Sequence, residues 1–167
     1  MMMRLAGFKY AALCCCFLAL AACSKKNQPS LDSGLNGGAA VGQAAPGSKA
    51  DFTTNVGDKV FFLQDQSTLT PEASDTLTKQ AGWLKQYAQV SIQVEGHADE
   101  RGTREYNIAL SARRATAARN FLIQQGVPGN RISSIAYGKE RPVALCDAEQ
   151  CWSQNRRAVT VITGGTN

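Results

Sequence analysis

The stretch "VSIQVEGHADERGTREYNIALSARRATAARNFLIQQG", residues 90–126, contains a strand pattern, a charged loop and a helix pattern in direct succession. Val90, Ile92 and Val94 alternate with polar residues, which is typical of a strand with one buried face and one solvated face. The charged loop follows at once and holds the single histidine of the chain. This succession predicts a helix packed on one face of a sheet.

The helix pattern has apolar residues at helical spacing. Tyr106, Leu110, Ala117 and Phe121 share one face of such a helix, so we expect this face to pack on the sheet. Gly126 stands where a helix of this pattern ends.

A second helix is predicted earlier in the chain by Thr70 as the cap, Pro71 at the first helical position and Glu72 in the first turn. Three further stretches have strand patterns: residues 56–62, 131–138 and 157–164. The order β-α-β-α-β-β predicts an α+β two-layer domain with helices packed on one face of a mixed sheet. The helical crossovers favour parallel pairing of the strands that they join.

The N-terminus has the pattern of an export signal. Arg4 and Lys9 flank the start of an apolar run, from Ala11 to Ala22, that is shorter than the roughly 20 residues of a membrane-spanning helix. We therefore interpret residues 1–22 as a signal peptide. The cysteines at 14–16 lie inside it and would be removed with it.

The segment "LAAC", residues 20–23, matches the bacterial lipobox, in which cleavage comes directly before a cysteine that carries lipid. It predicts lipidation of Cys23, with an ordinary signal peptide as the alternative. Ser24 follows in place of the aspartate that retains lipoproteins in the inner membrane, which favours the outer membrane.

The rest of the chain divides into a linker and one domain. Residues 23–54 are rich in Gly, Ala and Ser and have no sustained periodicity, so we expect a lipidated N-terminus followed by a flexible linker. We expect a single domain over residues 55–167.

Two features of the exported chain remain. Cys146 and Cys151 form an even pair in an exported protein, which predicts a disulfide. Loss of Arg4 and Lys9 lowers the formal net charge from +5 to +3. This mild excess, without a basic patch interleaved with aromatic residues, argues against nucleic acid binding.

The charged loop "EGHADERGTREYN", residues 95–107, has three possible uses. An enzyme is disfavoured because Asp99 and Glu100 are adjacent and would point apart, and because no nucleophile motif accompanies His97. A metal site is disfavoured because the chain has one histidine and a usable site needs three or four ligands. The third use is a solvated loop that starts a helix.

The solvated loop explains most of these charges. Thr103 can cap the helix, and acidic residues are favoured in its first turn. Asp99 fits less well, because it directly follows the strand, where a carboxylate can point into a pocket. We interpret His97 as structural. The solvated reading applies to four residues: Glu100, Arg101, Arg104 and Glu105.

Three motifs carry a resemblance to a known family: "GHADERGTREYNIALSARRA" (96–115), "YGKERP" (137–142) and "NRRAV" (155–159). Together they resemble the OmpA-like peptidoglycan-binding domain family. The order of lipobox, linker and domain is similar to that of lipoproteins in this family. Such domains bind the diaminopimelate of the peptidoglycan stem peptide without covalent chemistry.

The resemblance implies roles for particular residues. Asp99 matches the aspartate that binds the ligand's ammonium, and Arg114 matches the arginine that binds its carboxylate. Asn107 and Leu110 match positions that line the pocket. Arg157 matches an arginine near the site and is preferred to its neighbour in "NRR", Arg156. Two other arginines of this helix are expected at the surface: Arg113 and Arg119.

The implied chemistry is physically reasonable. Diaminopimelate presents an ammonium and a carboxylate on one carbon, and a carboxylate and a guanidinium at matching separation can hold both. Charge-assisted hydrogen bonds contribute roughly 1.5–3 kcal/mol each, which suggests micromolar affinity.

The chain departs from the family in the loop after the first strand. Phe62 matches a family position near the pocket, but Leu63 and Gln64 replace the residues that often follow. Asp65 is a candidate to compensate.

The resemblance also implies a function and partners. We expect a non-enzymatic outer-membrane lipoprotein that needs no cofactor or metal, faces the periplasm and tethers the membrane to peptidoglycan. The implied partners are TolB and the other Tol–Pal components, which act in envelope integrity and cell division. The alternative is a protein-interaction module that binds mainly a Tol-type partner and touches the wall little.

Overall fold

The computed structural model describes residues 44–166. The elements in chain order are α1 (Lys49–Asp51), the π-helical turn η1 (Phe52–Val56), β1 (Lys59–Phe61), α2 (Pro71–Gln86), β2 (Ser91–Gly96), α3 (Arg104–Gln124), the 3-10 turn η2 (Gly129–Arg131), β3 (Ile132–Ala136), α4 (Glu149–Asn155) and β4 (Arg157–Gly164). The predicted signal peptide, Cys23 and most of the predicted linker lie outside the described residues.

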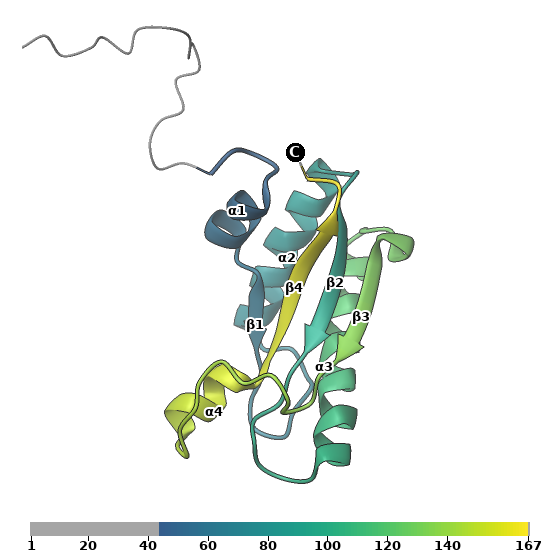
Figure 1. Cartoon of the computed structure of the whole chain (residues 1–167). Coiled ribbons are helices and arrows are strands. Elements are labelled where there is room, and N and C mark those ends of the chain that lie inside the picture. The colour runs from purple at the N-terminus through teal and green to yellow at the C-terminus, as the bar shows by residue number, and fades with distance from the viewer. Residues whose placement is uncertain (1–43, 167) are drawn as a thin grey trace, which may run out of the picture. The chain divides into compact units, whose positions relative to one another are not determined.

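The four strands form one mixed sheet in the order β1-β4-β2-β3, with α2 and α3 on one side of it (Figure 1). β2 and β3 are parallel, as expected of strands joined by a helix. β4 runs antiparallel to both β1 and β2 and separates them. The α+β two-layer fold is therefore confirmed, while parallel pairing holds only for the pair that α3 joins.

The folded domain begins earlier than predicted. Phe52 is buried in the core, and its ring lies 4.9 Å from that of Trp83. The indole Nε1 of Trp83 donates to the Asp51 carboxylate at 2.8 Å. The predicted boundary at residue 55 is therefore too late, because the preceding turn contributes an aromatic side chain to the core. Among residues 44–166, no helix is both long and apolar enough to cross a membrane.

The inner face of α3 differs from the predicted one. Tyr106 is exposed, and Ala117 and Phe121 are only half-buried. The buried residues lie one position away and include polar ones: Asn107, Leu110, Ser111, Arg114, Ala115, Ala118 and Leu122. Polar side chains can be buried on this face because they have hydrogen-bond partners. A pattern of apolar residues therefore does not reveal the face.

The end of β2 touches the middle of α3. A Cβ at Gly96 would lie 1.9 Å from the backbone oxygen of Ser111, so only glycine allows this approach. The contact brings the loop after β2 against the first half of α3.

Helix α4 was not predicted. It lies at the end of the sheet where β1 and β4 meet the long loops (Figure 1). The expected disulfide is present, and it joins Cys146, before the helix, to Cys151 within it.

Candidate functional site

Asp99 lies in the loop that leaves β2, and its carboxylate is largely buried. The Oδ1 atom accepts from the backbone N of Arg101 at 3.2 Å and from its Nε at 3.3 Å. The Oδ2 atom accepts from Nη2 of Arg101 at 2.6 Å and from Nη1 of Arg156 at 3.4 Å. Two guanidinium groups therefore flank one carboxylate.

The pKa of Asp99 reflects this surrounding. Burial of the carboxyl raises its pKa, but hydrogen bonds from Arg101 and Arg156, with the positive charge of Arg101, outweigh burial and hold the pKa below its usual value. Asp99 is accordingly ionised at neutral pH and attracts cations.

Arg101 was assigned to the solvated loop, and the structure gives it a different position. Its guanidinium pairs with Asp99 and lies 4.1 Å from the centre of the Trp152 ring. The segment "DER", residues 99–101, contains no periodic pattern that would predict this pairing. The spacing of two residues from Asp99 is the only clue, since a carboxylate can close a short turn on such a neighbour.

A cavity of about 280 Å³ opens beside Asp99. It has walls from the loop after β1, the loop after β2 and the first turns of α3. The residues that line it are Gln64, Asp65, Asp99, Arg101, Gly102, Tyr106, Asn107 and Leu110. Three of the predicted binding residues, Asp99, Asn107 and Leu110, thus share one cavity. The divergent loop after β1 contributes two further lining residues, Gln64 and Asp65.

Two residues fix the shape of the loop that carries Asp99. The Nδ2 atom of Asn107 donates to the backbone oxygen of Arg101 at 2.7 Å. Gly102 has a φ of 84°, which favours glycine. Thr103 then caps α3 as predicted, since its hydroxyl accepts from the N of Tyr106 at 3.2 Å.

Asp65 closes the opposite wall of the cavity. It has a left-handed backbone with a φ of 61°, and its carboxylate accepts a hydrogen bond from the hydroxyl of Tyr106. The loop after β1 therefore reaches α3 through an acidic side chain, although the residues that follow Phe62 depart from the family pattern.

Arg114 lies behind this cavity and is fully buried. Its guanidinium donates to the backbone oxygens of Gln66 at 2.8 Å, His97 at 2.8 Å and Leu63 at 3.2 Å. Burial lowers its pKa to about 10, although the Asp99 carboxylate acts in the opposite direction. Arg114 is still charged at neutral pH, and it joins the loop after β1 to the end of β2.

The two arginines of "NRR" occupy different places. Arg156 approaches Asp99, donates through Nε to the oxygen of Phe62 at 3.1 Å and pairs with Glu149. Arg157 donates instead to the oxygen of Arg141 at 3.1 Å. The structure thus brings Arg156, rather than the preferred Arg157, next to Asp99, because adjacent residues at the start of a strand point in opposite directions.

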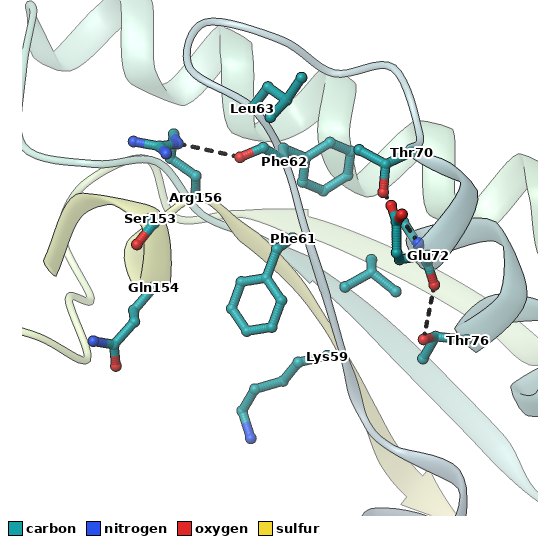
Figure 2. A pocket seen from close by; sticks show the side chains of 12 residues that line it. Lys59, Phe61, Phe62, Leu63, Thr70, Glu72, Thr76, Ser153, Gln154 and Arg156 are labelled. Atoms are coloured by element: carbon teal, nitrogen blue, oxygen red, sulfur yellow. Dashed lines mark hydrogen bonds between the residues drawn. The ribbon is translucent and has the colours of Figure 1, made fainter. Parts of the chain in front are cut away.

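Phe62 does not line the cavity of Asp99. Its buried ring belongs to the core, 5.2 Å from the Arg114 guanidinium. Phe62 also lines a larger cleft, of about 550 Å³, between β1, the start of α2 and α4 (Figure 2). That cleft contains neither Asp99 nor Arg114.

His97 is buried against the ring of Tyr137. Burial, and then the charges of Arg157 and Arg141, lower its pKa to about 4, so the imidazole is neutral at pH 7. Its Nε2 lies 3.7 Å from the Glu95 carboxylate. Its side chain is not on the wall of the Asp99 cavity, in line with a structural role.

Comparison with known proteins identifies the family. The sequence profile of the OmpA family matches residues 61–157. The peptidoglycan-associated lipoprotein of Brucella melitensis is 61% identical over 148 residues, which are 88% of this chain and 87% of that protein. The protein of the same name from Mesorhizobium japonicum is 58% identical over 149 residues, with 88% and 87% covered.

A solved structure agrees. The crystal structure of the peptidoglycan-associated lipoprotein from Burkholderia pseudomallei superposes with a TM-score of 0.65 at 36% identity. The superposition covers 68% of this chain and 98% of that one. The chain belongs to the OmpA family.

Proposed function

We propose that this chain is an outer-membrane lipoprotein that binds peptidoglycan noncovalently through the diaminopimelate of its stem peptide. The observation that carries the proposal is the ionised Asp99 carboxylate on the wall of a cavity of about 280 Å³. The names of the similar lipoproteins support the same class of ligand. Lipid on Cys23 and the linker then tether the membrane to the wall, without catalysis.

Each group of the ligand has a counterpart in this site. Asp99 holds the ammonium of diaminopimelate, while Asn107 and Leu110 form the wall against which its carbon chain lies. Arg114 supplies the positive charge for the carboxylate. Because its guanidinium is buried against three backbone oxygens, direct contact requires the loop after β1 to move outward.

Sedimentation with purified sacculi tests the proposal. Asp99→Asn keeps the shape of the side chain and removes its charge, and we expect about 10- to 100-fold weaker binding by the full chain, since a charge-assisted bond is lost. The matched control is Asp75→Asn, at an exposed position of α2. Equal binding by wild type and Asp99→Asn would falsify the site.

TolB and the other Tol–Pal components belong to the same proposal, and they rest on the family resemblance alone. Pull-down from solubilised envelopes measures them separately from wall binding. If the chain is instead a protein-interaction module, the wild type should capture a Tol-type partner and should bind sacculi no better than the Asp99→Asn variant.

The lipid anchor is tested by Cys23→Ser. We expect the variant to leave the membrane fraction after cell lysis. Continued membrane retention of Cys23→Ser would exclude the anchor and leave the wall-binding proposal intact.

A further inference from the structure

We infer that Arg101 occupies, in the free protein, the place at Asp99 that the ligand's ammonium takes, and that Trp152 on α4 holds it there. Binding is then an exchange of one cation for another. This inference rests on the proposed function and adds to it the contact that sets the affinity of the site.

The hydrogen bonds of Asp99 carry the first step. A carboxylate has about four lone-pair positions. Among the described residues, Arg101 supplies three donors to Asp99 and Arg156 supplies one. An ammonium that approaches Asp99 therefore has to displace a donor already in place.

The two arginines differ in their freedom to leave. The Arg156 side chain is 6% exposed and is also bonded to Glu149 and to the oxygen of Phe62. The Arg101 side chain is 33% exposed and lines the cavity itself. Arg101 is accordingly the group that the ligand exchanges.

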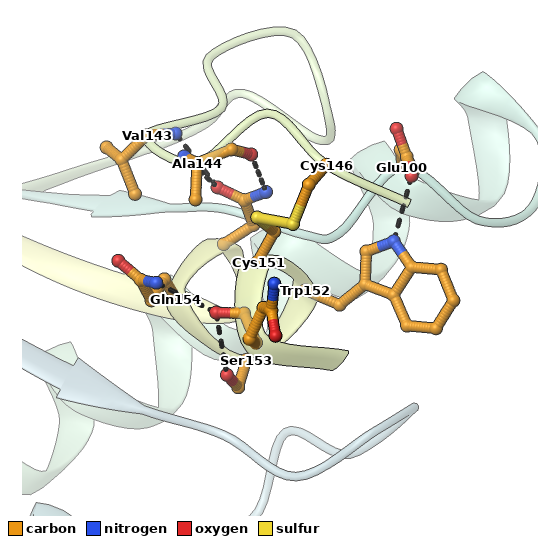
Figure 3. Close-up of a disulfide and its surroundings, with 10 residues drawn as sticks. Glu100, Val143, Ala144, Cys146, Cys151, Trp152, Ser153 and Gln154 are labelled. Carbon is orange, nitrogen blue, oxygen red and sulfur yellow. Dashed lines mark hydrogen bonds between the residues drawn. A yellow bond between two sulfur atoms is a disulfide. The ribbon is translucent and has the colours of Figure 1, made fainter. Parts of the chain in front are cut away.

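Trp152 contacts the two residues that follow Asp99 in the loop, Glu100 and Arg101. Its ring stacks on the Arg101 guanidinium at 4.1 Å. Its Nε1 donates to the Glu100 carboxylate at 2.8 Å, as Figure 3 shows. A stacked guanidinium gains roughly 0.5–2 kcal/mol, which corresponds to a factor of about 2 to 30. This is enough to bias the equilibrium at Asp99.

The position of Trp152 depends in turn on two interactions that hold α4 in place, a disulfide and the hydrogen bonds of Asn155. A helix of seven residues, begun at Ala148 without a side-chain cap, is unstable on its own. The disulfide ties the helix to Cys146 (Figure 3). The Asn155 side chain accepts from the N of Val143 and donates to the oxygen of Ala144, both at 2.8 Å. The disulfide thus acts on the site through Trp152.

The consequence is a lowered affinity. When only a fraction of the protein has its binding group free, the apparent dissociation constant rises in inverse proportion to that fraction. Weakening the Arg101–Trp152 contact should therefore tighten binding, whereas a rigid, preformed site would bind more weakly after the same change.

Calorimetry with the tripeptide L-Ala-γ-D-Glu-meso-diaminopimelate tests this on the full chain in detergent. We expect Trp152→Ala to bind about three- to tenfold more tightly and Trp152→Phe, which keeps a ring, to change less. The Cys146→Ser/Cys151→Ser variant should shift in the same direction. The control on the same helix is Gln150→Ala, at an exposed position. Unchanged or weaker binding by Trp152→Ala overturns the inference.

A double-mutant cycle separates this role from a general loosening of the fold. Arg101→Gln should itself tighten binding, and in that background Trp152→Ala should add nothing. An equal effect of Trp152→Ala with and without Arg101 overturns the inference, even if α4 unfolds. The NMR signal of the Arg101 Nε–H gives a direct view, since it should move when tripeptide replaces the guanidinium at Asp99, and a fixed signal contradicts the exchange.

Failure of the two proposals can be told apart. If Asp99→Asn binds tripeptide as well as wild type, the proposed function fails. If Asp99→Asn loses binding and Trp152→Ala does not gain it, only the exchange at Asp99 fails.

Discussion

The two halves of helix α3 bury different chemistry. The half that follows the Asp99 loop buries Asn107, Ser111 and Arg114, whereas the far half buries Ala118 and Leu122. Leu110 is the one apolar residue among the buried residues of the first half, so this half buries mostly polar side chains, whereas the buried residues of the far half are all apolar.

The polar half holds backbone from separate parts of the chain. Asn107 bonds the loop after β2, Ser111 accepts from the N of Gly138 at 2.9 Å, and Arg114 bonds the loop after β1. The apolar half joins the helix layer to the sheet. Hydrophobic contact has no direction, while hydrogen bonds fix positions. The first half of α3 therefore positions the site, and the second half stabilises the fold.

The largest effects on stability are expected when one buried side chain is removed from each half of α3. Leu122→Ala should lower the free energy of unfolding by about 2–5 kcal/mol, because it leaves a cavity in the core. Arg114→Ala should cost on the order of 3–5 kcal/mol, because it leaves buried backbone oxygens without donors. Urea unfolding measures both.

Binding then distinguishes the two variants. In conditions where both are folded, Leu122→Ala should bind sacculi normally and Arg114→Ala should not. Loss of binding in Leu122→Ala while its near-ultraviolet circular dichroism stays native would show that the two halves are not separate in function.

His97 lies where the two regions meet, since its backbone oxygen accepts from Arg114 and its ring is buried. Its pKa falls from 6.5 to about 4 on folding. Between these values the unfolded chain binds more protons, so this stability is fully present above pH 6.5 and is lost as the pH falls toward 4. The loss is on the order of 2–3 kcal/mol.

Urea unfolding at pH 7 and pH 4.5 measures this loss. His97→Gln should be less stable at pH 7, and its stability should vary less between the two pH values. An equally steep loss in His97→Gln would assign the pH dependence to other groups, among which Glu95 is nearest to the ring at 3.7 Å.

Much of the fold followed from local patterns. The alternation at Val90, Ile92 and Val94 and the caps at Thr70 and Thr103 predicted β2, α2 and α3 correctly. The insertion of β4 between β1 and β2 could not be predicted, since sheet order depends on contacts distant in sequence. Helix α4 was missed because seven residues carry too little periodicity.

The site was predictable only in part. Asp99 was proposed because it lies near the end of a strand and matches the family's aspartate, and the structure places it on the wall of a cavity. Arg101 and Trp152 were missed because their contact joins positions 51 residues apart in sequence. Which of Arg156 and Arg157 lies next to Asp99 depends on where their side chains point at the junction of α4 and β4. A shift of one residue at this junction reverses the two directions.

The two helix caps give a smaller test of the comparison. Thr70 accepts from the N of Ala73 and Thr103 from the N of Tyr106, both at 3.2 Å. Substitution of either by alanine should cost about 1 kcal/mol. Only Thr103→Ala should weaken binding of sacculi, because the first turn of α3 lines the cavity. Equal binding by both variants would mean that this turn does not need its cap.

The smallest effect is expected at an ion pair outside both regions. Arg104 and Glu140 lie 3.1 Å apart from Nε to Oε1, but their side chains are 68% and 50% exposed. Water and salt screen such a pair, so Glu140→Gln should change the free energy of unfolding by less than about 0.5 kcal/mol and leave binding unaltered. Urea unfolding at low and high salt measures it. A loss above about 1 kcal/mol that persists at high salt would place this pair in the polar network of the site, since surface pairs do not behave in that way. The contrast with the Arg101–Asp99 pair, which is far less exposed, would then depend on something other than burial.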